Sequence, residues 1–359
     1  MKGRIVRDIT PSEENKRNSE GSFVTLKDGS ILFAYSRFGS QGDRDGSASD
    51  IYGVLSHDNG ESFGEPFLLF KQEDAQATNI MSPSLQRMAN GDLGLFFLAK
   101  RDPALGMPHL VRSKDEGKTW SEPVCCVTRD GYFVLNHDRV IRLPNGRLLL
   151  TTAHHETSVI NGEAVIIDKP ALFEVFGSDD DGQTWFALNK PVALPISKAL
   201  QYGVQEPGAV ALKDGRIWSF IRTFSGRQYE TFSSDNGVTW TEPVPSIFTT
   251  PPSPLTAKRL SDGRIMAVWN PIPLHPFNPE GVGEFWNWGR TPLVYAFSED
   301  EMETFSRPVV LETGDHHGYC YAAIYEVSDG VLLAYNAGGL EDGGMLNRLR
   351  IRKIPRNEL

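Results

Sequence analysis

The sequence predicts an all-β protein, a six-bladed β-propeller whose blades are four-stranded antiparallel sheets. Two repeats support this prediction. An eight-residue motif, Ser-x-Asp-x-Gly-x-Ser/Thr-aromatic, returns every 55 to 65 residues, and a long regular period of this kind is typical of propellers and other repeat folds. Six Asp-Gly or Asn-Gly pairs form the second repeat, and each lies between two β-like runs, which is the strongest local indication of a hairpin.

The motif has four regular copies and one altered copy. Its Asp is expected to accept hydrogen bonds from nearby backbone N–H groups and its Gly to adopt a positive φ, so that the chain turns tightly. The closing aromatic ring is a large apolar anchor between neighbouring units. The regular copies are Ser56–Phe63, Ser113–Trp120, Ser178–Trp185 and Ser233–Trp240, and the altered copy, Ser298–Phe305, has Met302 at the Gly position.

The hairpins define the blades. In the first hairpin, residues 23–26 and 31–35 flank the turn Asp28-Gly29. We expect each hairpin to supply the two inner strands of a blade and the motif to join the two outer strands, as in other propellers. The sixth unit lacks a motif, so Arg4-Ile5-Val6 is expected to complete it beside residues 349–354, and residues 1–359 form a single domain. The other turns are Asn90-Gly91, Asn145-Gly146, Asp214-Gly215, Asp262-Gly263 and Asp329-Gly330.

Composition narrows the range of partners. The net charge of -10 and the pI of about 5.4 argue against nucleic-acid binding through bulk charge. The three cysteines, Cys125, Cys126 and Cys320, form neither a disulfide framework nor a Cys-x-x-Cys metal spacing. The first residues contain no apolar run like that of a signal peptide, and no stretch is long enough to cross a membrane. We therefore expect a cytoplasmic protein without a metal or a cofactor.

Hairpin geometry also indicates where the functional face lies. If the six turns share one rim, the starts of the first strands and the ends of the second strands surround the mouth of the central channel at the opposite rim, where ligand sites are common. Unpaired charges buried in such a channel are costly, so we expect a pocket for an anionic or polyhydroxylated ligand. The alternative interpretation is that the strands simply end in polar loops. The first strands start at Glu20, Ser82, Asn136-His137-Asp138, Gln205-Glu206, Ser253 and His317-Gly318-Tyr319, and the second strands end at Arg37, Lys100, His154, Arg222, Asn270 and Asn336.

The repeated motif resembles the Asp-box of the sialidase (neuraminidase) superfamily, whose members are six-bladed propellers, and the resemblance covers most of the chain. It implies a Tyr nucleophile assisted by a Glu, an Asp acid/base and three Arg residues that hold the substrate carboxylate. Gly318-Tyr319-Cys320 resembles the segment of the nucleophile, which implies Tyr319, and Glu206 opens the fourth blade, where the family has its Glu. A Tyr hydroxyl with a pKa near 10 needs such a neighbouring base to attack.

The resemblance also implies two arginines and the acid. Arg222 follows Glu206 by 16 residues and matches the second family Arg, and Arg290 precedes the fifth motif copy and matches the third. Guanidinium groups suit a carboxylate because they bind it with two parallel hydrogen bonds. The family Asp lies about eleven residues before the first motif copy, which implies Asp45. The alternatives in the same segment are Asp43 and Asp50.

Two positions depart from the family pattern. Where the family carries its first Arg in an Arg-Ile-Pro segment, this chain reads Asn18-Ser19-Glu20, and Glu20 would repel a carboxylate. Arg17 and Arg37 are the candidates to replace the missing Arg. The Asp-Pro that opens the family's second blade is Ser82-Pro83 here, which implies an altered pocket.

Further polar and aromatic residues lie near the same rim. His137 and Asp138 open the third blade and His154 ends its second strand, so they are candidates to bind sugar hydroxyls. Their spacing is not that of a zinc site. Trp286-Asn287-Trp288 precedes Arg290 and would either stack on a sugar face or pack over the fifth blade.

The resemblance therefore implies a glycoside hydrolase that removes a terminal acidic sugar with retention from a small carbohydrate or glycoconjugate. Its expected catalytic residues are Tyr319, Glu206 and Asp45, and its expected substrate-binding residues are Arg37, Arg222, Arg290, Glu20, His137, Asp138 and His154. One alternative is a propeller enzyme for a different sugar, either another glycosidase or a polysaccharide lyase, in which Glu20, His137, Asp138 or His154 does the acid/base work. The other alternative is a carbohydrate-binding propeller without catalysis.

Overall fold

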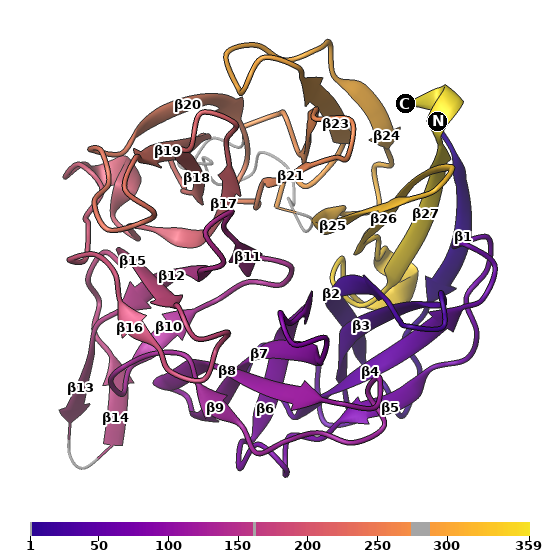
Figure 1. Cartoon of the computed structure of the whole chain (residues 1–359), viewed down its shortest axis with the longest axis horizontal. Coiled ribbons are helices and arrows are strands. Elements are labelled where there is room, and N and C mark those ends of the chain that lie inside the picture. Colours follow the sequence, from indigo (N-terminus) through magenta and orange to yellow (C-terminus); the bar gives the residue numbers. More distant parts are fainter. Residues whose placement is uncertain (1, 161–162, 274–287) are drawn as a thin grey trace.

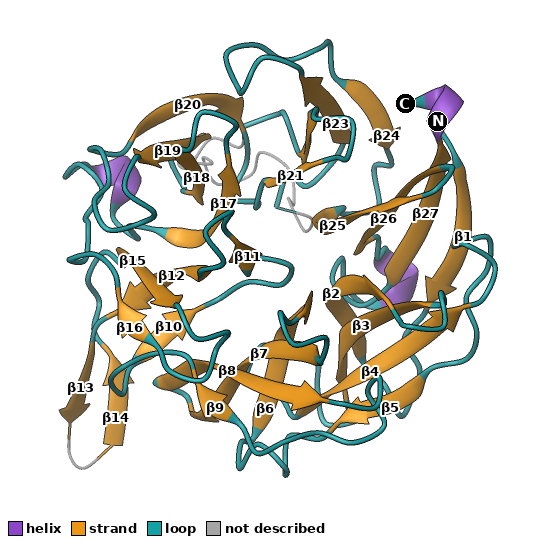
Figure 2. Ribbon diagram, viewed as in Figure 1, coloured by secondary structure: helices purple, strands orange, loops and turns teal. Residues whose placement is uncertain are grey.

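The computed structural model describes residues 2–160, 163–273 and 288–359, and the described chain is all-β apart from three short 3-10 helices. Figure 1 shows the sheets one after another around a common centre in chain order, with the two termini side by side. Figure 2 shows how completely strands and loops make up the molecule. The prediction of an all-β fold is confirmed.

Four sheets are antiparallel and have four strands each. The first contains β2 (Arg17–Thr25), β3 (Ile31–Phe38), β4 (Ser49–Ser56) and β5 (Phe67–Phe70). Two more contain β17 (Gln205–Ala211), β18 (Ile217–Arg222), β19 (Arg227–Ser233) and β20 (Val244–Thr249), and then β21 (Thr256–Arg259), β22 (Ile265–Trp269), β23 (Leu293–Ser298) and β24 (Val309–Glu312). The fourth orders its strands as β1 (Arg4–Ile9), β27 (Leu349–Pro355), β26 (Gly330–Asn336) and β25 (Cys320–Val327).

The second and third predicted units are joined into one nine-stranded sheet. The link is a parallel pair between β8 and β10 at Gly106 and Tyr132. The predicted first strand of the third unit is reduced to β11, because the segment before it leaves the sheet and the Asp138 N–H donates to the carbonyl of Pro83 instead. The strands are β6 (Asn79–Arg87), β7 (Leu93–Asp102), β8 (Leu105–Ser113), β9 (Val124–Cys125), β10 (Tyr132–Val134), β11 (Ile141–Arg142), β12 (Leu148–His155), β15 (Leu172–Ser178) and β16 (Phe186–Ala187).

The remaining elements lie outside these sheets. A separate hairpin of β13 (Thr157–Ile160) and β14 (Glu163–Ile166) extends from the nine-stranded sheet (Figure 1). The 3-10 helices are η1 (Lys198–Leu200), η2 (Leu340–Asp342) and η3 (Arg356–Glu358). Across the three described ranges, none of the helices has the length and the apolar character that a membrane crossing requires.

The repeated motif forms the same hydrogen-bonded turn in every copy. In the first copy, Asp58 accepts hydrogen bonds from the Ser56 hydroxyl and from the backbone and hydroxyl of Ser62, and the Gly60 N–H donates to Ser56 Oγ. In the altered copy, Met302 takes the Gly position with φ 83° and its N–H still donates to the first Ser. The turn therefore depends on the Ser and the Asp, and the Gly only lowers its conformational cost.

Apolar clusters fill the interfaces between neighbouring sheets. In one of them, Leu32 and Ile51 of the first sheet pack against Leu95 and Phe97 of the next, and all four are almost inaccessible to solvent. The ring of the motif adds to these interfaces, as Trp120 does here. This packing holds each sheet against the next and so fixes where the inner strands lie.

The first strand of the chain completes the last sheet, as predicted. β1 pairs with β27 in antiparallel register, with Arg4 opposite Lys353 and Ile9 opposite Leu349. Arg350 holds Asp8 through two hydrogen bonds of 2.9 Å. Strands from both ends of the chain therefore share one sheet.

Candidate active site

Four inner strands carry the same backbone irregularity. The pairings of β2, β6, β17 and β25 with their neighbours are each interrupted by a bulge. A residue other than Gly adopts a left-handed conformation in each bulge: Glu20 (φ 52°), Ser82 (φ 57°), Glu206 (φ 42°) and Tyr321 (φ 56°). This conformation costs about 1 kcal/mol or more per residue. Bulges re-aim side chains and gather next to active sites, so these four residues are the first candidates for a functional site.

Tyr321 and Glu206 form the centre of the site. The Tyr321 hydroxyl donates a 2.8 Å hydrogen bond to Glu206 Oε1. Arg222 Nη1 donates to Glu206 Oε2 over 2.6 Å and lies 3.3 Å from the Tyr321 hydroxyl oxygen. Burial and the charge of Glu206 raise the pKa of Tyr321, although Arg222 and Arg290 oppose this shift. The phenol is therefore neutral near pH 7, and a carboxylate stands ready to accept its proton.

Arg290 lies against the other side of Tyr321. Its guanidinium carbon is 5.2 Å from the centre of the Tyr321 ring. Its two terminal nitrogens donate to the thiol sulfur of Cys320 over 3.2 Å and to the carbonyl of Pro252 over 3.1 Å. In the part of the chain that the structure describes, no carboxylate pairs with Arg290, although the side chain is only 5% exposed. A buried guanidinium without a carboxylate partner is suited to bind an anion.

A second carboxylate cluster adjoins this pair. Ser82 Oγ donates to Glu20 Oε2 over 2.5 Å, and Arg17 Nη2 donates to Glu20 Oε1 over 3.4 Å. The other nitrogen of Arg17 donates to Asp45 Oδ1 over 2.6 Å. Burial raises the pKa of Glu20 to about 7, Asp45 and Glu206 contribute to the rise, and Arg17 and Ser82 oppose it. The pKa of the Glu20 carboxyl therefore lies near neutrality.

His137 packs against Tyr321. The two rings meet edge to face at 5.9 Å, and His137 Nε2 lies 3.3 Å from the carbonyl oxygen of Ala322, the residue after Tyr321. Burial, together with the charge of Arg139, lowers the pKa of His137 to about 3, although the charge of Asp138 opposes this shift. A neutral imidazole in this position orients Tyr321 and does not donate a proton to a substrate.

Comparison with known proteins identifies the family. The model described as a BNR repeat-like domain matches residues 38–333, most of the chain. The chain belongs to the BNR repeat-like domain family. Its fold is that of the sialidase superfamily, as the solved structures below indicate. No curated protein sequence matches it.

Several solved structures resemble this BNR repeat-like protein over nearly all of its length. One is a protein of unknown function from Dyadobacter fermentans, with 18% identity, a TM-score of 0.71 and coverage of 98% of this chain and 99% of that chain. The NanB sialidase of Streptococcus pneumoniae has 13% identity and a TM-score of 0.70, with coverage of 100% of this chain and 71% of that chain. The intramolecular trans-sialidase of Ruminococcus gnavus has 15% identity and a TM-score of 0.69, with coverage of 99% of this chain and 98% of that chain. At these identities the likeness concerns the fold.

The tyrosine predicted from the sequence of this BNR repeat-like protein does not reach Glu206. Tyr319 is buried between the last two sheets, where its hydroxyl lies 3.5 Å from the carbonyl of Thr313 and its ring stacks on His317. Its backbone N–H donates to the carbonyl of Arg290 over 2.7 Å. Tyr319 therefore helps to position Arg290, and Tyr321, two residues later, occupies the place predicted for the nucleophile.

A sequence signal could have found Tyr321. Glu20, Ser82 and Glu206 each precede the first residue of their hairpin turn by eight positions, and Tyr321 precedes Asp329 by the same number, whereas Tyr319 precedes it by ten. The bulge at each of these positions re-aims the side chain, so the shared spacing gives the four residues the same local geometry. The pattern of hydrophobic residues alone does not indicate the bulge.

The other predicted residues divide into two groups. Asp45 lies at the site because it pairs with Arg17. Of the two candidates for the missing Arg, it is Arg17 and not Arg37 that lies beside Glu20. Three residues make their contacts elsewhere. The Arg37 guanidinium carbon lies 4.5 Å from the centre of the Tyr52 ring, and Asp138 accepts a hydrogen bond from the Ser22 hydroxyl and pairs with Lys258. His154 stacks on Phe133 beside the ion pair of Arg129 and Glu174. The structure therefore does not bring Arg37 or His154 to Tyr321.

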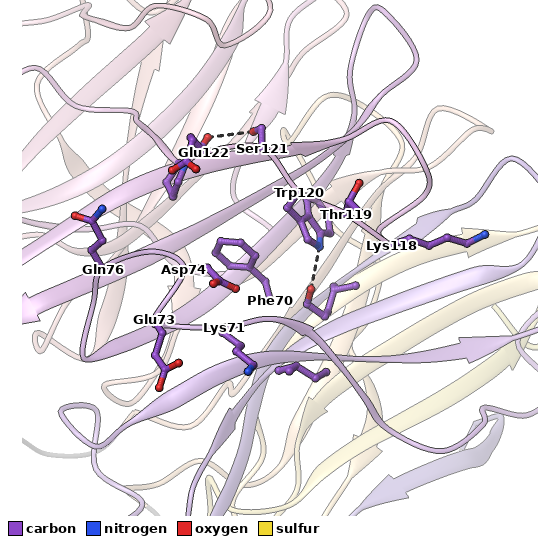
Figure 3. Close-up of a pocket in the computed structure, with 13 residues that line it drawn as sticks. Phe70, Lys71, Glu73, Asp74, Gln76, Lys118, Thr119, Trp120, Ser121 and Glu122 are labelled. Atoms are coloured by element: carbon purple, nitrogen blue, oxygen red, sulfur yellow. Dashed lines mark hydrogen bonds between the residues drawn. The ribbon is translucent and has the colours of Figure 1, made fainter.

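Two surface hollows lie away from the candidate site. One, of about 610 Å³, lies between β5 and the second motif copy and is lined by Phe70, Asp74 and Trp120 among others (Figure 3). The other, of about 840 Å³, lies beside the C-terminus and includes Tyr295. Neither hollow is lined by the residues of the candidate site, which are Tyr321, Glu206, Arg222, Arg290 and Glu20. The described ranges hold no group of three or more His, Cys, Asp or Glu suited to a metal ion, and Trp286 and Asn287 lie outside them.

Proposed function

We propose that this protein is a retaining glycoside hydrolase that removes a terminal acidic sugar through a Tyr321 nucleophile and a Glu206 base. The observation that carries this proposal is the 2.8 Å hydrogen bond from the Tyr321 hydroxyl to Glu206, flanked by Arg222 and Arg290. A nucleophile held within hydrogen-bond reach of its base is the arrangement that covalent catalysis requires.

Chemistry at the pair follows from the charges. Glu206 takes the proton of the Tyr321 hydroxyl as the phenolate oxygen attacks the anomeric carbon, and the glycosidic bond breaks as a second carboxyl group of the site protonates the leaving oxygen. A neutral hydroxyl approaches a sugar that bears a carboxylate without the repulsion that a carboxylate nucleophile would meet. Water then attacks the same carbon and gives one proton back to that second carboxyl group, the bond to Tyr321 breaks, and the proton returns from Glu206 to the phenolate oxygen. Two inversions give net retention.

Binding of the sugar acid would depend on two arginines. Arg222 already pairs with Glu206 over 2.6 Å, so it contributes its remaining donors. Arg290 contributes more, because its terminal nitrogens donate to a thiol sulfur and one carbonyl, and its Nε has no partner among the described residues. The described chain thus offers a two-arginine carboxylate site in place of the family's three, with Arg17 already engaged by Glu20 and Asp45.

The architecture supports the same proposal. We infer that the sheets form six blades of a closed propeller, with the nine-stranded sheet representing two blades. The pairing of β1 with β27 and the packing of β2 against β25 support closure. Solved structures with the same fold include sialidases and trans-sialidases, one of them in complex with oseltamivir carboxylate.

A glycoside screen tests the function. The purified protein is assayed with 4-methylumbelliferyl glycosides of N-acetylneuraminic acid, of other nonulosonic acids, of glucuronic acid and of neutral sugars. Turnover of an acidic-sugar glycoside is expected, and proton NMR of the first product should show the anomer of the substrate. Turnover of neutral sugars alone, an unsaturated product of elimination, or binding without turnover would each contradict the proposal.

A further inference from the structure

Glu20 shares the backbone geometry of the catalytic pair. It occupies the bulge of β2 just as Glu206 and Tyr321 occupy the bulges of β17 and β25, with the same left-handed conformation and the same spacing to the hairpin turn. Its side chain is 4% exposed. The strain at this position is therefore used to hold a carboxyl group beside the reacting pair.

Titratable groups from four elements face Glu20. Arg17 comes from β2 itself, Asp45 from the loop after β3, and Glu206 from β17, and Tyr321 of β25 feels the charge of Glu20 in turn. Ser82 of β6 donates the shortest hydrogen bond, at 2.5 Å to Glu20 Oε2. Arg17 contacts both Glu20 and Asp45, and the charge of Asp45 opposes the stabilisation that Arg17 gives to the Glu20 carboxylate. Two nearby carboxylates and burial then favour a protonated Glu20.

Asp45 has the opposite environment. Its side chain is 65% exposed and bound to Arg17 over 2.6 Å, and the Lys100 ammonium donates to its backbone carbonyl over 2.8 Å. Although desolvation opposes the shift, the charges of Arg17 and Lys100 lower the pKa of Asp45. A carboxylate held ionised in this way cannot supply a proton near pH 7.

We propose that Glu20, and not Asp45, is the acid/base residue of this site, and that Asp45 only helps to keep Glu20 protonated, through its own charge and its ion pair with Arg17. This inference rests on the proposed Tyr321–Glu206 mechanism. In the first step the Glu20 carboxyl gives its proton to the leaving glycosidic oxygen as the carbon–oxygen bond breaks. In the second step the Glu20 carboxylate takes a proton from the attacking water, so Glu20 returns to its starting state and the net reaction is hydrolysis.

A leaving-group comparison tests the assignment, because an acid is needed only where the departing alkoxide is poor. With Glu20→Gln, kcat/KM for an alkyl glycoside of the accepted sugar should fall by roughly 100-fold or more, whereas kcat/KM for its 4-methylumbelliferyl glycoside should fall less than about 10-fold. Sodium azide, which needs no base, should restore kcat of Glu20→Ala on the aryl glycoside and yield a glycosyl azide. Glu65→Gln, on an exposed side chain, is the matched control and should behave as wild type.

Asp45→Asn and a pH profile separate the two carboxyls. A general acid must be protonated, so wild-type kcat/KM on the alkyl glycoside should fall above about pH 7. Removing the Asp45 charge lowers the pKa of Glu20, so this limb should move to lower pH in Asp45→Asn, without the leaving-group dependence of Glu20→Gln. A large leaving-group effect in Asp45→Asn together with none in Glu20→Gln would make Asp45 the acid.

Failure of this inference differs from failure of the proposed function. If Tyr321→Phe keeps full activity, or if no glycoside is hydrolysed, the nucleophile proposal fails and this one with it. If Tyr321→Phe is inactive but Glu20→Gln slows aryl and alkyl glycosides equally, only the assignment of Glu20 is overturned. Carbon-13 NMR of glutamate-labelled protein, with Glu20→Gln to assign the signal, adds a readout that needs no substrate, and a Glu20 carboxyl titrating near 4.5 would also overturn it.

Discussion

The Tyr321 hydroxyl donates a 2.8 Å hydrogen bond to Glu206 across 115 residues of chain. Both residues sit in bulges of inner strands, β25 and β17, and both have left-handed backbone. Two separate sheets therefore each adopt a strained backbone conformation at the residue that brings a phenol or a carboxylate to this contact. Structural packing alone would not require this strain at both positions.

Tyr321→Phe should lose at least about 1,000-fold in kcat, because it removes the attacking oxygen and leaves the ring in place. Tyr319→Phe is the matched control, since its hydroxyl meets only the carbonyl of Thr313 at 3.5 Å, and it should keep nearly all activity. Initial rates on the accepted aryl glycoside, with circular dichroism to confirm folding, make the measurement. Equal loss in the two variants would remove the distinction drawn between them.

Arg290→Lys should raise KM for the acidic-sugar glycoside by roughly 10-fold or more, with a smaller effect on kcat. An ammonium group keeps the charge but cannot present two parallel donors to a carboxylate. Arg37→Lys provides the comparison, because the Arg37 guanidinium lies over the Tyr52 ring, and it should leave KM unchanged. A rise in KM confined to Arg37→Lys would place the carboxylate at the other side of the site.

The stability of the protein should depend on Glu20 as the pH rises. Burial raises the pKa of Glu20 from 4.5 to about 7, so the stabilisation of its neutral form is complete below pH 4.5 and is lost as the pH rises through 7. Glu20→Gln cannot ionise. Relative to wild type it should therefore gain about 3 kcal/mol of unfolding free energy between pH 4.5 and 8, at about 1.36 kcal/mol per pKa unit. Urea unfolding at both pH values measures this, and a difference that does not change with pH contradicts it.

The motif should act on stability without touching catalysis. Asp180 accepts hydrogen bonds from the Ser178 hydroxyl and from the backbone and hydroxyl of Thr184, so Asp180→Ala should cost about 2 kcal/mol. Asp179→Ala beside it breaks only an exposed ion pair with Arg147 and should cost under about 1 kcal/mol. Thermal unfolding ranks the two variants, and kcat should be unchanged in both. A fall in kcat with Asp180→Ala at a temperature where it stays folded would link the motif to the site.

Much of the fold was readable from the sequence because its signals are local. The turn at Asp28-Gly29 and the Ser56–Phe63 motif act through neighbouring residues, so their roles follow from residue type and spacing. The pairing of β1 with β27 was also predicted, because the last unit lacked a strand. The fusion of the second and third units was not, since it depends on one parallel contact between Gly106 and Tyr132.

The site was only partly readable. Glu206, Arg222 and Arg290 were found at the centre because the family resemblance fixed their place in the blades. The resemblance implied Tyr319, whereas Tyr321 lies beside Glu206 in the structure, because a bulge decides which of two nearby tyrosines faces Glu206. The raised pKa of Glu20 comes mainly from its burial, and the Arg17–Asp45 ion pair joins a strand to a loop; no spacing in the sequence encodes either feature.

Covalent trapping tests the central claim most directly. The protein is incubated with a 3-fluoro glycosyl fluoride of the accepted sugar acid, digested with trypsin and analysed by fragmentation mass spectrometry. We predict one glycosyl adduct on the peptide of residues 291–348, assigned by its fragments to Tyr321 and absent from Tyr321→Phe. An adduct on Glu206, Glu20 or Tyr319, or turnover of the fluoride with no adduct in quenched samples, would contradict the account.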